Sequence, residues 1–286
     1  MDLPSKEITL YLFCMKKRHK IYLSSVVLLL IACSGCSKNS TSSYYNSSLF
    51  VKLVDAPASF ESIEIVVQRV EIHNASMLEN LGWRVVSNDM QYYDILKLRN
   101  GNFKWLVGEK IPSGTYDKFK IVFNIGSIVV DGSEYRLEPD KSIKDGAIFD
   151  YQFSVDDGDR FQLTFDMEVG ESIFAYTGVT KYYILKPSFR IQPTLLAGNI
   201  AGQIQNPDST GAAATISTIL EKTGDKVTTT SEPNTGSFQI TDIPEGFYSV
   251  TIAPEDSNLL AAITIDSIYV ERQRTTNISV HRFQQK

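Results

Sequence analysis

Hydrophobic and polar residues alternate with a period of two through much of the chain after Leu49. This period is typical of β-strands with one buried face. The alternation is clearest over 161–169, where phenylalanine, leucine, methionine and valine take every second position. Segment 149–155 alternates in the same way, and the acidic, glycine-containing run 156–159 separates the two. We expect these segments to form a β-hairpin.

Other segments refine this prediction. Asp131-Gly132 predicts a second hairpin turn between 127–130 and 134–137. The hydrophobic phase changes within 63–73, which requires one inserted residue and predicts a β-bulge near Gln68-Arg69. We expect short helical or irregular turns at 95–98 and 103–106.

A domain boundary is predicted between Pro193 and Asn199, where prolines end one strand and glycines flank the next. Seven short strands follow within about ninety residues, a number and spacing typical of a small β-sandwich. They are predicted at 200–205, 215–220, 226–230, 237–241, 248–253, 263–270 and 275–280. The fold class expected is all-β, with two consecutive prealbumin- or immunoglobulin-like sandwiches at 49–195 and 196–286.

One local signature occurs in both predicted domains. The segments 111–116 and 243–248 both read Ile-Pro-x-Gly-x-Tyr and precede a hydrophobic strand. Proline presets one corner of a turn and glycine tolerates positive φ, so we expect a turn that leads into a core strand.

Residues 199–283 resemble the carboxypeptidase-regulatory-like, or transthyretin-like, module. The resemblance rests on Gly202-Gln203-Ile204, on 235–240 and on 243–250. It implies a non-catalytic sandwich that supports or binds. Residues 49–192 are similar to a domain-of-unknown-function family of bacterial envelope lipoproteins, through Val54-Asp55-Ala56-Pro57-Ala58, 70–73, 111–116, Leu163-Thr164-Phe165-Asp166 and Leu185-Lys186-Pro187. That resemblance implies an architecture and no activity.

The N-terminal segment has the layout of an exported signal peptide, with basic residues at 15–20, a hydrophobic run from Tyr22 and a small residue before Cys33. Leu30-Ile31-Ala32-Cys33 resembles the lipoprotein signal, in which Cys33 is acylated and becomes the first mature residue. Cys36 is the alternative lipidation site. The run is shorter than the roughly 20 residues that span a membrane. We expect a signal peptide over 1–32, whose true start is Met15.

Residues 33–48 then form a lipidated cysteine and a serine-rich flexible linker. Two or more acyl chains anchor a protein stably in a bilayer. An aspartate directly after Cys33 would resemble the inner-membrane retention signal of enteric bacteria. Because no aspartate follows Cys33, we expect the chain in the outer membrane, in either leaflet.

Charge and cysteine content narrow the classes of partner. Residues 1–32 hold five of the 28 basic and two of the 33 acidic residues, so the mature chain carries 23 basic and 31 acidic residues, a net of −8. This balance argues against nucleic-acid binding. No cysteine follows Cys36, so stability must come from hydrophobic cores rather than disulfides.

Candidate chemistry is sparse. The mature chain has two histidines, His73 and His281, and no zinc-protease, nucleophile-elbow or phosphate-loop motif. We therefore expect no enzyme and no cofactor. The oxygen-rich turn that contains Asp156, Asp157 and Asp159 is the best candidate for calcium, but its spacing does not fit the EF-hand loop, so we expect a plain hairpin turn and no metal.

We expect most aromatic residues to pack in hydrophobic cores, but four of them are candidates for a binding role. Trp83, Trp105, Tyr92 and Tyr182 are the candidate binding residues, because exposed rings bind sugars and anchor protein interfaces. Adjacent tyrosines in a strand point to opposite faces, so one of each Tyr-Tyr pair faces outward. The sequence thus predicts a lipid-anchored structural or assembly protein, or alternatively a surface adhesin that binds glycans, with an unidentified protein or glycan as partner.

Overall fold

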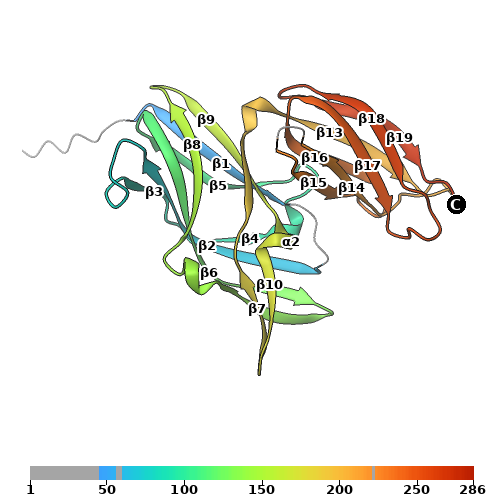
Figure 1. Ribbon diagram of the computed structural model, residues 1–286, viewed down its shortest axis with the longest axis horizontal. Helices are drawn as coiled ribbons and strands as arrows, with labels where there is room; N and C mark the ends of the chain where they lie inside the picture. The colour runs from blue at the N-terminus through green and yellow to red at the C-terminus, as the bar shows by residue number, and fades with distance from the viewer. Residues whose placement is uncertain (1–44, 56–59, 221–222) are drawn as a thin grey trace, which may run out of the picture. The chain divides into compact units, whose positions relative to one another are not determined.

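The computed structural model describes residues 45–55, 60–220 and 223–286. The predicted signal peptide, Cys33, Cys36 and all but the end of the linker lie outside these residues. The described chain is an all-β sandwich fold, as the sequence predicted, with a few short helical turns (Figure 1).

The first sandwich contains twelve strands and lies between residues 47 and 193. Its strands are β1 (Ser47–Asp55), β2 (Ser62–Asn74), β3 (Trp83–Ser87), β4 (Gln91–Asp94), β5 (Lys104–Ile111), β6 (Gly114–Val130), β7 (Ser133–Pro139), β8 (Ala147–Val155), β9 (Arg160–Met167), β10 (Ile173–Thr177), β11 (Lys181–Leu185) and β12 (Phe189–Pro193). Its helical turns are η1 (Ile95–Lys97), η2 (Lys141–Ile143) and α2 (Val169–Ser172).

These strands form two sheets. Sheet A has the order β12-β9-β1-β5, and sheet B runs β10-β11-β7-β6-β2-β3, with β4 also paired to β2 and β8 to β6. Leu49, Val51 and Leu53 of β1 point from sheet A into a core that also contains Phe119 of β6 and Phe165 of β9. Burial of these alternating residues holds the two sheets face to face.

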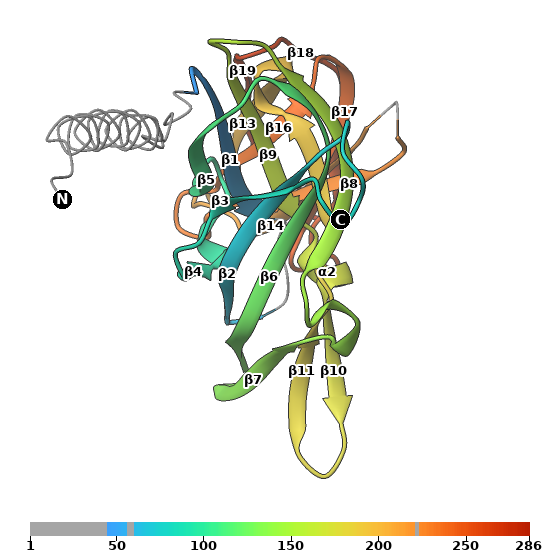
Figure 2. The same ribbon diagram turned by 90° about the vertical axis from the view of Figure 1, so that its left-hand side faces the viewer.

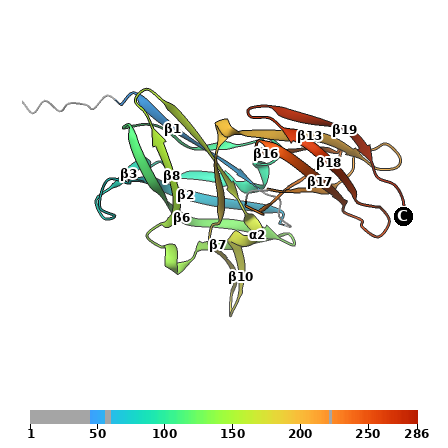
Figure 3. The same ribbon diagram turned by 45° about the horizontal axis from the view of Figure 1, so that its top comes forward.

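The second sandwich follows the short turn η3 (Thr194–Leu196). Its strands are β13 (Ala197–Gln205), β14 (Ala214–Ile219), β15 (Lys226–Thr230), β16 (Ser237–Pro244), β17 (Gly246–Pro254), β18 (Ile263–Val270) and β19 (Thr275–Arg282). Sheet C has the order β16-β13-β19 (Figure 3), and sheet D has the order β15-β14-β17-β18 (Figure 1). Ile200, Ile216, Val250 and Ile252 belong to a second hydrophobic core, separate from the first.

Several predictions from the hydrophobic pattern are confirmed. All seven strands predicted after the proposed boundary are present. β6 and β7 pair through a turn at Asp131 and Gly132, both with positive φ. The register of β2 against β6 shifts between Val67 and Arg69, where the bulge was expected.

Other predictions are wrong. β8 and β9 do not form a hairpin, because β8 pairs with β6 in sheet B whereas β9 pairs with β1 and β12 in sheet A. The acidic turn between them therefore carries the chain from one sheet to the other. Residues 104–106 belong to the strand β5 rather than to an irregular turn, although η1 matches the turn expected at 95–98. Alternation reveals which residues share a face but not which strand lies beside them.

The repeated Ile-Pro-x-Gly-x-Tyr signature occupies the same place in both sandwiches. It lies where β5 of sheet A leads into β6 of sheet B, and again where β16 of sheet C leads into β17 of sheet D. The hydroxyl of Tyr116 donates to the carbonyl oxygen of Pro112 at 2.8 Å, and that of Tyr248 donates to Pro244 at 2.7 Å. Gly114 has positive φ but Gly246 does not, so glycine conformation is not the shared requirement. The tyrosine bond secures each passage between sheets.

Candidate functional site at the junction of the two sandwiches

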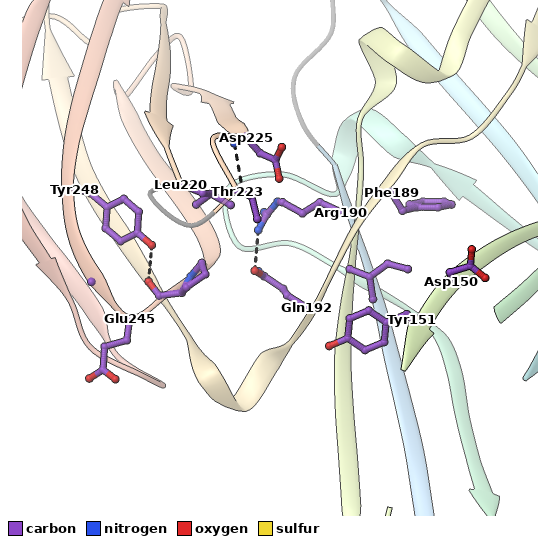
Figure 4. A pocket seen from close by; sticks show the side chains of 13 residues that line it. Asp150, Tyr151, Phe189, Arg190, Gln192, Leu220, Thr223, Asp225, Glu245 and Tyr248 are labelled. Carbon is purple, nitrogen blue, oxygen red and sulfur yellow. Dashed lines mark hydrogen bonds between the residues drawn. The ribbon is translucent and has the colours of Figure 1, made fainter. Parts of the chain in front are cut away.

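A cavity of about 430 Å³ lies where the two sandwiches meet (Figure 4). The first sandwich contributes residues of β8 and β12, and the second contributes the corner before β17 and residues near β14 and β15. Its described lining is Asp150, Tyr151, Phe189, Arg190, Ile191, Gln192, Leu220, Thr223, Asp225, Pro244, Glu245, Gly246 and Tyr248. The cavity therefore exists only when both sandwiches are present.

Arg190 on β12 is the central charged group at this junction. Its guanidinium contacts Asp166 Oδ2 at 2.5 Å and donates to Gln192 Oε1 at 2.8 Å. It also donates to the backbone oxygen of Asp242 at 3.1 Å, which joins β12 to β16 of the second sandwich. Arg190 and Asp166 face each other in the register of β12 and β9, so the pairing of these strands sets the contact.

A second buried ion pair lies beside it. Lys52 Nζ on β1 lies 2.6 Å from Asp242 Oδ2 on β16. Lys52 and Asp166 lie on the outer face of sheet A. The residues immediately before and after each of them in its strand point into the core. The second sandwich covers part of this outer face, which is why Asp166 is only 6% exposed.

Burial dominates the electrostatics of Asp166. It raises the pKa of Asp166 above its ordinary value, while the Arg190 guanidinium lowers it and Asp242 raises it further. Burial also raises the pKa of Glu168, and the charges of Asp166 and Asp225 add to that rise. Asp166 Oδ1 and Gln192 Nε2 are among the four buried side-chain polar atoms that have no hydrogen-bond partner in the described residues.

The loop 99–102 provides a third link between the sandwiches. Asn100 Oδ1 accepts hydrogen bonds from Thr229 Oγ1 at 3.0 Å and from the backbone amide of Gln239 at 3.1 Å. Its Nδ2 donates to Glu232 Oε1 at 2.8 Å. Asn100 has a φ of 54°, a conformation that asparagine tolerates better than most residues. Both polar atoms of the Asn100 side chain thus form hydrogen bonds across the junction.

Aromatic rings and carboxylates line the cavity. Tyr151, Phe189 and Tyr248 supply aromatic rings, and the exposed carboxylates Asp150 and Asp225 supply acceptors. The described lining contains no histidine, cysteine or serine. Glu245 is already occupied, with Arg272 Nε at 2.8 Å and the Tyr269 hydroxyl at 3.0 Å.

The predicted aromatic residues do not gather at this cavity. Trp83 packs against His73, with ring centroids 5.1 Å apart, and under Lys120 Nζ at 4.2 Å. Tyr182 packs on Tyr176 of the neighbouring strand at 4.6 Å. Tyr92 is 53% exposed and Tyr93 is 1% exposed, which confirms that such a pair divides between two faces.

Trp105 belongs to a separate exposed group on the outer face of sheet A. Its ring lies 5.6 Å from that of Phe50 and 5.0 Å from that of Phe103, and Arg160 lies 4.1 Å from the Phe50 ring. We call Phe50, Phe103 and Trp105 the sheet A patch. Trp105 is 44% exposed and Phe103 is 43% exposed. Of the residues singled out from the sequence, only Trp105 takes part.

The acidic turn makes local contacts. Asn46 Nδ2 donates weakly to the Asp157 carboxylate at 3.4 Å, and Ser47 Oγ donates to the backbone oxygen of Asp156 at 2.9 Å. Within the described ranges, no group of three or more histidine, cysteine, aspartate or glutamate residues is arranged to hold a metal ion. Asp156, Asp157 and Asp159 thus stay candidate ligands on sequence grounds alone.

Sequence reasoning missed the charged residues of the junction. Asp166 fits the polar phase of β9, but alternation cannot distinguish a face exposed to water from one covered by another sandwich. The one signal in the sequence for these charged residues was that a single charge lies between two core residues of the same strand, as Lys52 does between Val51 and Leu53.

Residues 46–187 match the model of a family described as "Domain of unknown function (DUF4382)". The match covers the first sandwich up to the strand before β12, and it agrees with the resemblance of 49–192 to a domain-of-unknown-function family. This match does not extend to 199–283, and the resemblance of that region to the transthyretin-like module stays a prediction. No curated protein matches this chain.

Several solved structures are similar to the chain. They include the TIE protein of Bacillus anthracis, at 12% identity over 91% of this chain and 44% of that chain, with a TM-score of 0.24. GBS52, the minor pilin of Streptococcus agalactiae, matches at 9% identity over 83% and 97%, with a TM-score of 0.24. BcpA, the major pilin subunit of Bacillus cereus, matches at 11% identity over 84% and 70%, with a TM-score of 0.24. This chain spans less than half of the TIE protein, and likenesses at these scores carry no argument about function.

No helix in the described part of the chain combines the length and the hydrophobicity needed to cross a membrane.

Proposed function

We propose that this chain is a lipid-anchored, non-catalytic protein of the bacterial cell envelope with a structural or assembly role. The observation that carries the proposal is the buried junction, where Lys52 pairs with Asp242 and Arg190 pairs with Asp166. These charges link the two sandwiches to each other. A firmly joined pair of sandwiches behind a flexible linker suits a protein that holds partners at a distance from a membrane.

The lipid anchor follows from the sequence of 15–33, with Cys33 as the acylated residue and Cys36 as the alternative. The test is membrane fractionation in the native host, with the Cys33→Ala and Cys36→Ala variants as a matched pair. We expect Cys33→Ala alone to release the chain from the membrane fraction. Release by Cys36→Ala alone would move the acylation site, and retention of the double variant would refute the lipid anchor.

The structural role has its own test. Protease treatment of intact and lysed cells shows on which side of the outer membrane the sandwiches lie, and crosslinking then captures neighbours on that side. We expect partners that are lost with Lys52→Met, which loosens the junction, and that are kept with Lys97→Met. Lys97 forms an exposed ion pair with Asp94 on the same sandwich. Partners that persist in both variants would contradict a role for the junction.

Glycan binding is the second candidate function, and the junction cavity favours it. Sugars are bound by stacking on aromatic rings and by planar polar side chains. Tyr151 and Phe189 offer rings, and Asp150 and Asp225 offer acceptors.

A glycan array with three variants separates the two places where a sugar could bind. Tyr151→Ala should abolish binding in the cavity, Trp105→Ala should abolish binding on the sheet A patch, and Met77→Ala is the control, since Met77 is 54% exposed and lies on neither surface. Absence of any glycan bound by the parent chain would reject this candidate.

A further inference from the structure

The hairpin formed by β10 and β11 stands away from the rest of sheet B (Figure 2). β11 pairs with β7 over only three residues, Tyr183–Leu185. β10 is the terminal strand of the sheet, so one of its edges has no strand beside it among the described residues. The hairpin also lies at the opposite end of the first sandwich from the start of β1.

This edge lacks the features by which proteins usually protect a terminal strand. Protection comes from charged residues, proline, bulges or a covering element. β10 contains no charged residue and no proline, and its register against β11 is unbroken. Lys181 is the single charged residue in 173–185. Phe174 is 48% exposed and Tyr176 is 47% exposed, although both are large hydrophobic residues.

The exposed residues form a stripe on one face of the hairpin. Phe174 and Tyr176 are two positions apart on β10 and therefore share a face. Opposite them on β11 are Ile184 and Tyr182, and the rings of Tyr176 and Tyr182 lie 4.6 Å apart. A further strand added to β10 would extend this stripe and bury the exposed rings.

We propose that β10 pairs in an antiparallel manner with β10 of a second copy of this chain, about a two-fold axis at Ala175. A two-fold interface requires one strand to be complementary to itself. With Ala175 on the axis, Phe174 faces the partner's Tyr176, and Ile173 faces the partner's Thr177. Aromatic residues thus meet aromatic residues, β-branched residues meet β-branched residues, and no carboxylate enters the interface.

The complementarity of the strand with itself is what selects a second copy over an unrelated partner. Like-charged copies repel each other, but the hairpin carries only Lys181, so the net charge of the chain lies elsewhere. Five paired residues form a small interface, and we expect weak association in solution. The inference does not depend on the lipid anchor, although a shared membrane would raise the effective concentration.

The test is analytical ultracentrifugation of residues 45–286, which form one compact unit, contain both hydrophobic cores and hold no cysteine. We expect a monomer–dimer equilibrium at concentrations up to about 1 mM. Ala175→Arg places two like charges against each other on the axis and should raise the dissociation constant at least about tenfold. Val85→Arg is the control, because Val85 is 48% exposed on β3, the opposite edge of sheet B.

A mixing experiment tests the register. Phe174→Lys and Tyr176→Glu should each weaken self-association, but a mixture of the two chains should associate more tightly than either alone, because Lys then faces Glu across the pair. A parent chain that stays monomeric at about 1 mM would overturn the proposal. So would dimerisation that Ala175→Arg leaves unchanged, or that Val85→Arg abolishes, since an unrelated surface would then be responsible.

Discussion

Lys52 Nζ lies 2.6 Å from Asp242 Oδ2, and this ion pair joins the first strand of the first sandwich to β16 of the second. The Lys52 side chain is 13% exposed and that of Asp242 is 7% exposed. Arg190 and Asp166 form a second ion pair close by, and Arg190 also bonds the backbone of Asp242. Because water is largely excluded, each charge depends on its partner for compensation.

Lys52→Met should lower the free energy of unfolding by about 3 kcal/mol, because it leaves the Asp242 carboxylate buried beside a second carboxylate. Chemical denaturation of residues 45–286 measures the change. Adding Asp242→Asn to Lys52→Met should recover part of the loss. A loss of unfolding free energy in the double variant that exceeds the sum of the losses in the two single variants would contradict the ion pair as the cause.

Asn100→Ala should lower the free energy of unfolding by roughly 1–3 kcal/mol, because Thr229 Oγ1, the backbone amide of Gln239 and the Glu232 carboxylate all lose their hydrogen-bond partner. It should also increase proteolysis in the 99–102 loop. Asn102→Ala, in the same loop, is the control and should leave both measurements unchanged.

Gly236→Ala should prevent the second sandwich from folding. A Cβ atom there would lie 1.8 Å from the backbone oxygen of Ile204, and the φ of 71° disfavours alanine in addition. Gly158→Ala is the matched control, with a φ of 85° and nothing within 4 Å, so it should cost only about 1–2 kcal/mol. Circular dichroism and thermal melting compare the two. Equal stability of both variants would show that the backbone at Gly236 shifts freely.

Tyr93 predicts a loss of stability at alkaline pH. Burial raises the pKa of Tyr93 to about 12 from 10.0. Above pH 10 the unfolded chain releases this proton while the folded chain keeps it, so the free energy of unfolding should fall by roughly 2–3 kcal/mol as the pH rises through both values. Tyr93→Phe should reduce this slope, and it should cost stability at neutral pH, because the hydroxyl donates to Trp105 O at 3.1 Å. Urea titrations across the alkaline range check both effects.

Truncation tests the domain boundary predicted at 195/196. Removing residues 199–286 leaves the first hydrophobic core complete, so the remaining chain should still unfold cooperatively. It should be less stable than residues 45–286, because Lys52 loses Asp242 and the outer face of sheet A is uncovered. Unfolding without cooperativity would show that the first sandwich depends on the second.

Much of the local structure was predictable from the sequence because it depends on neighbouring residues. The seven strands of the second sandwich, the Asp131-Gly132 turn and the bulge at Val67–Arg69 each follow from hydrophobic phase and turn chemistry. The Ile-Pro-x-Gly-x-Tyr repeat also identified equivalent places in both sandwiches, although the bond from each tyrosine to its proline carbonyl was not foreseen.

The candidate site was not predictable in the same way. Trp83, Tyr92 and Tyr182 were chosen as exposed rings, but the cavity is lined by Tyr151, Phe189 and Tyr248. Aromatic content does not reveal which rings meet, because the rings that line the cavity come from strands that are distant in sequence.

The sequence alone determined that the chain is built of β-strands, where its turns lie and that its cores must act without disulfides, since these properties follow from residue type and spacing. Only the tertiary structure decided that β8 and β9 belong to different sheets, and that Asp166 is buried against Arg190. The physical reason is that a strand has two faces and two edges. Its sequence records the polarity of the faces, but the partner of each edge and the element that covers each face are fixed only when the whole chain packs.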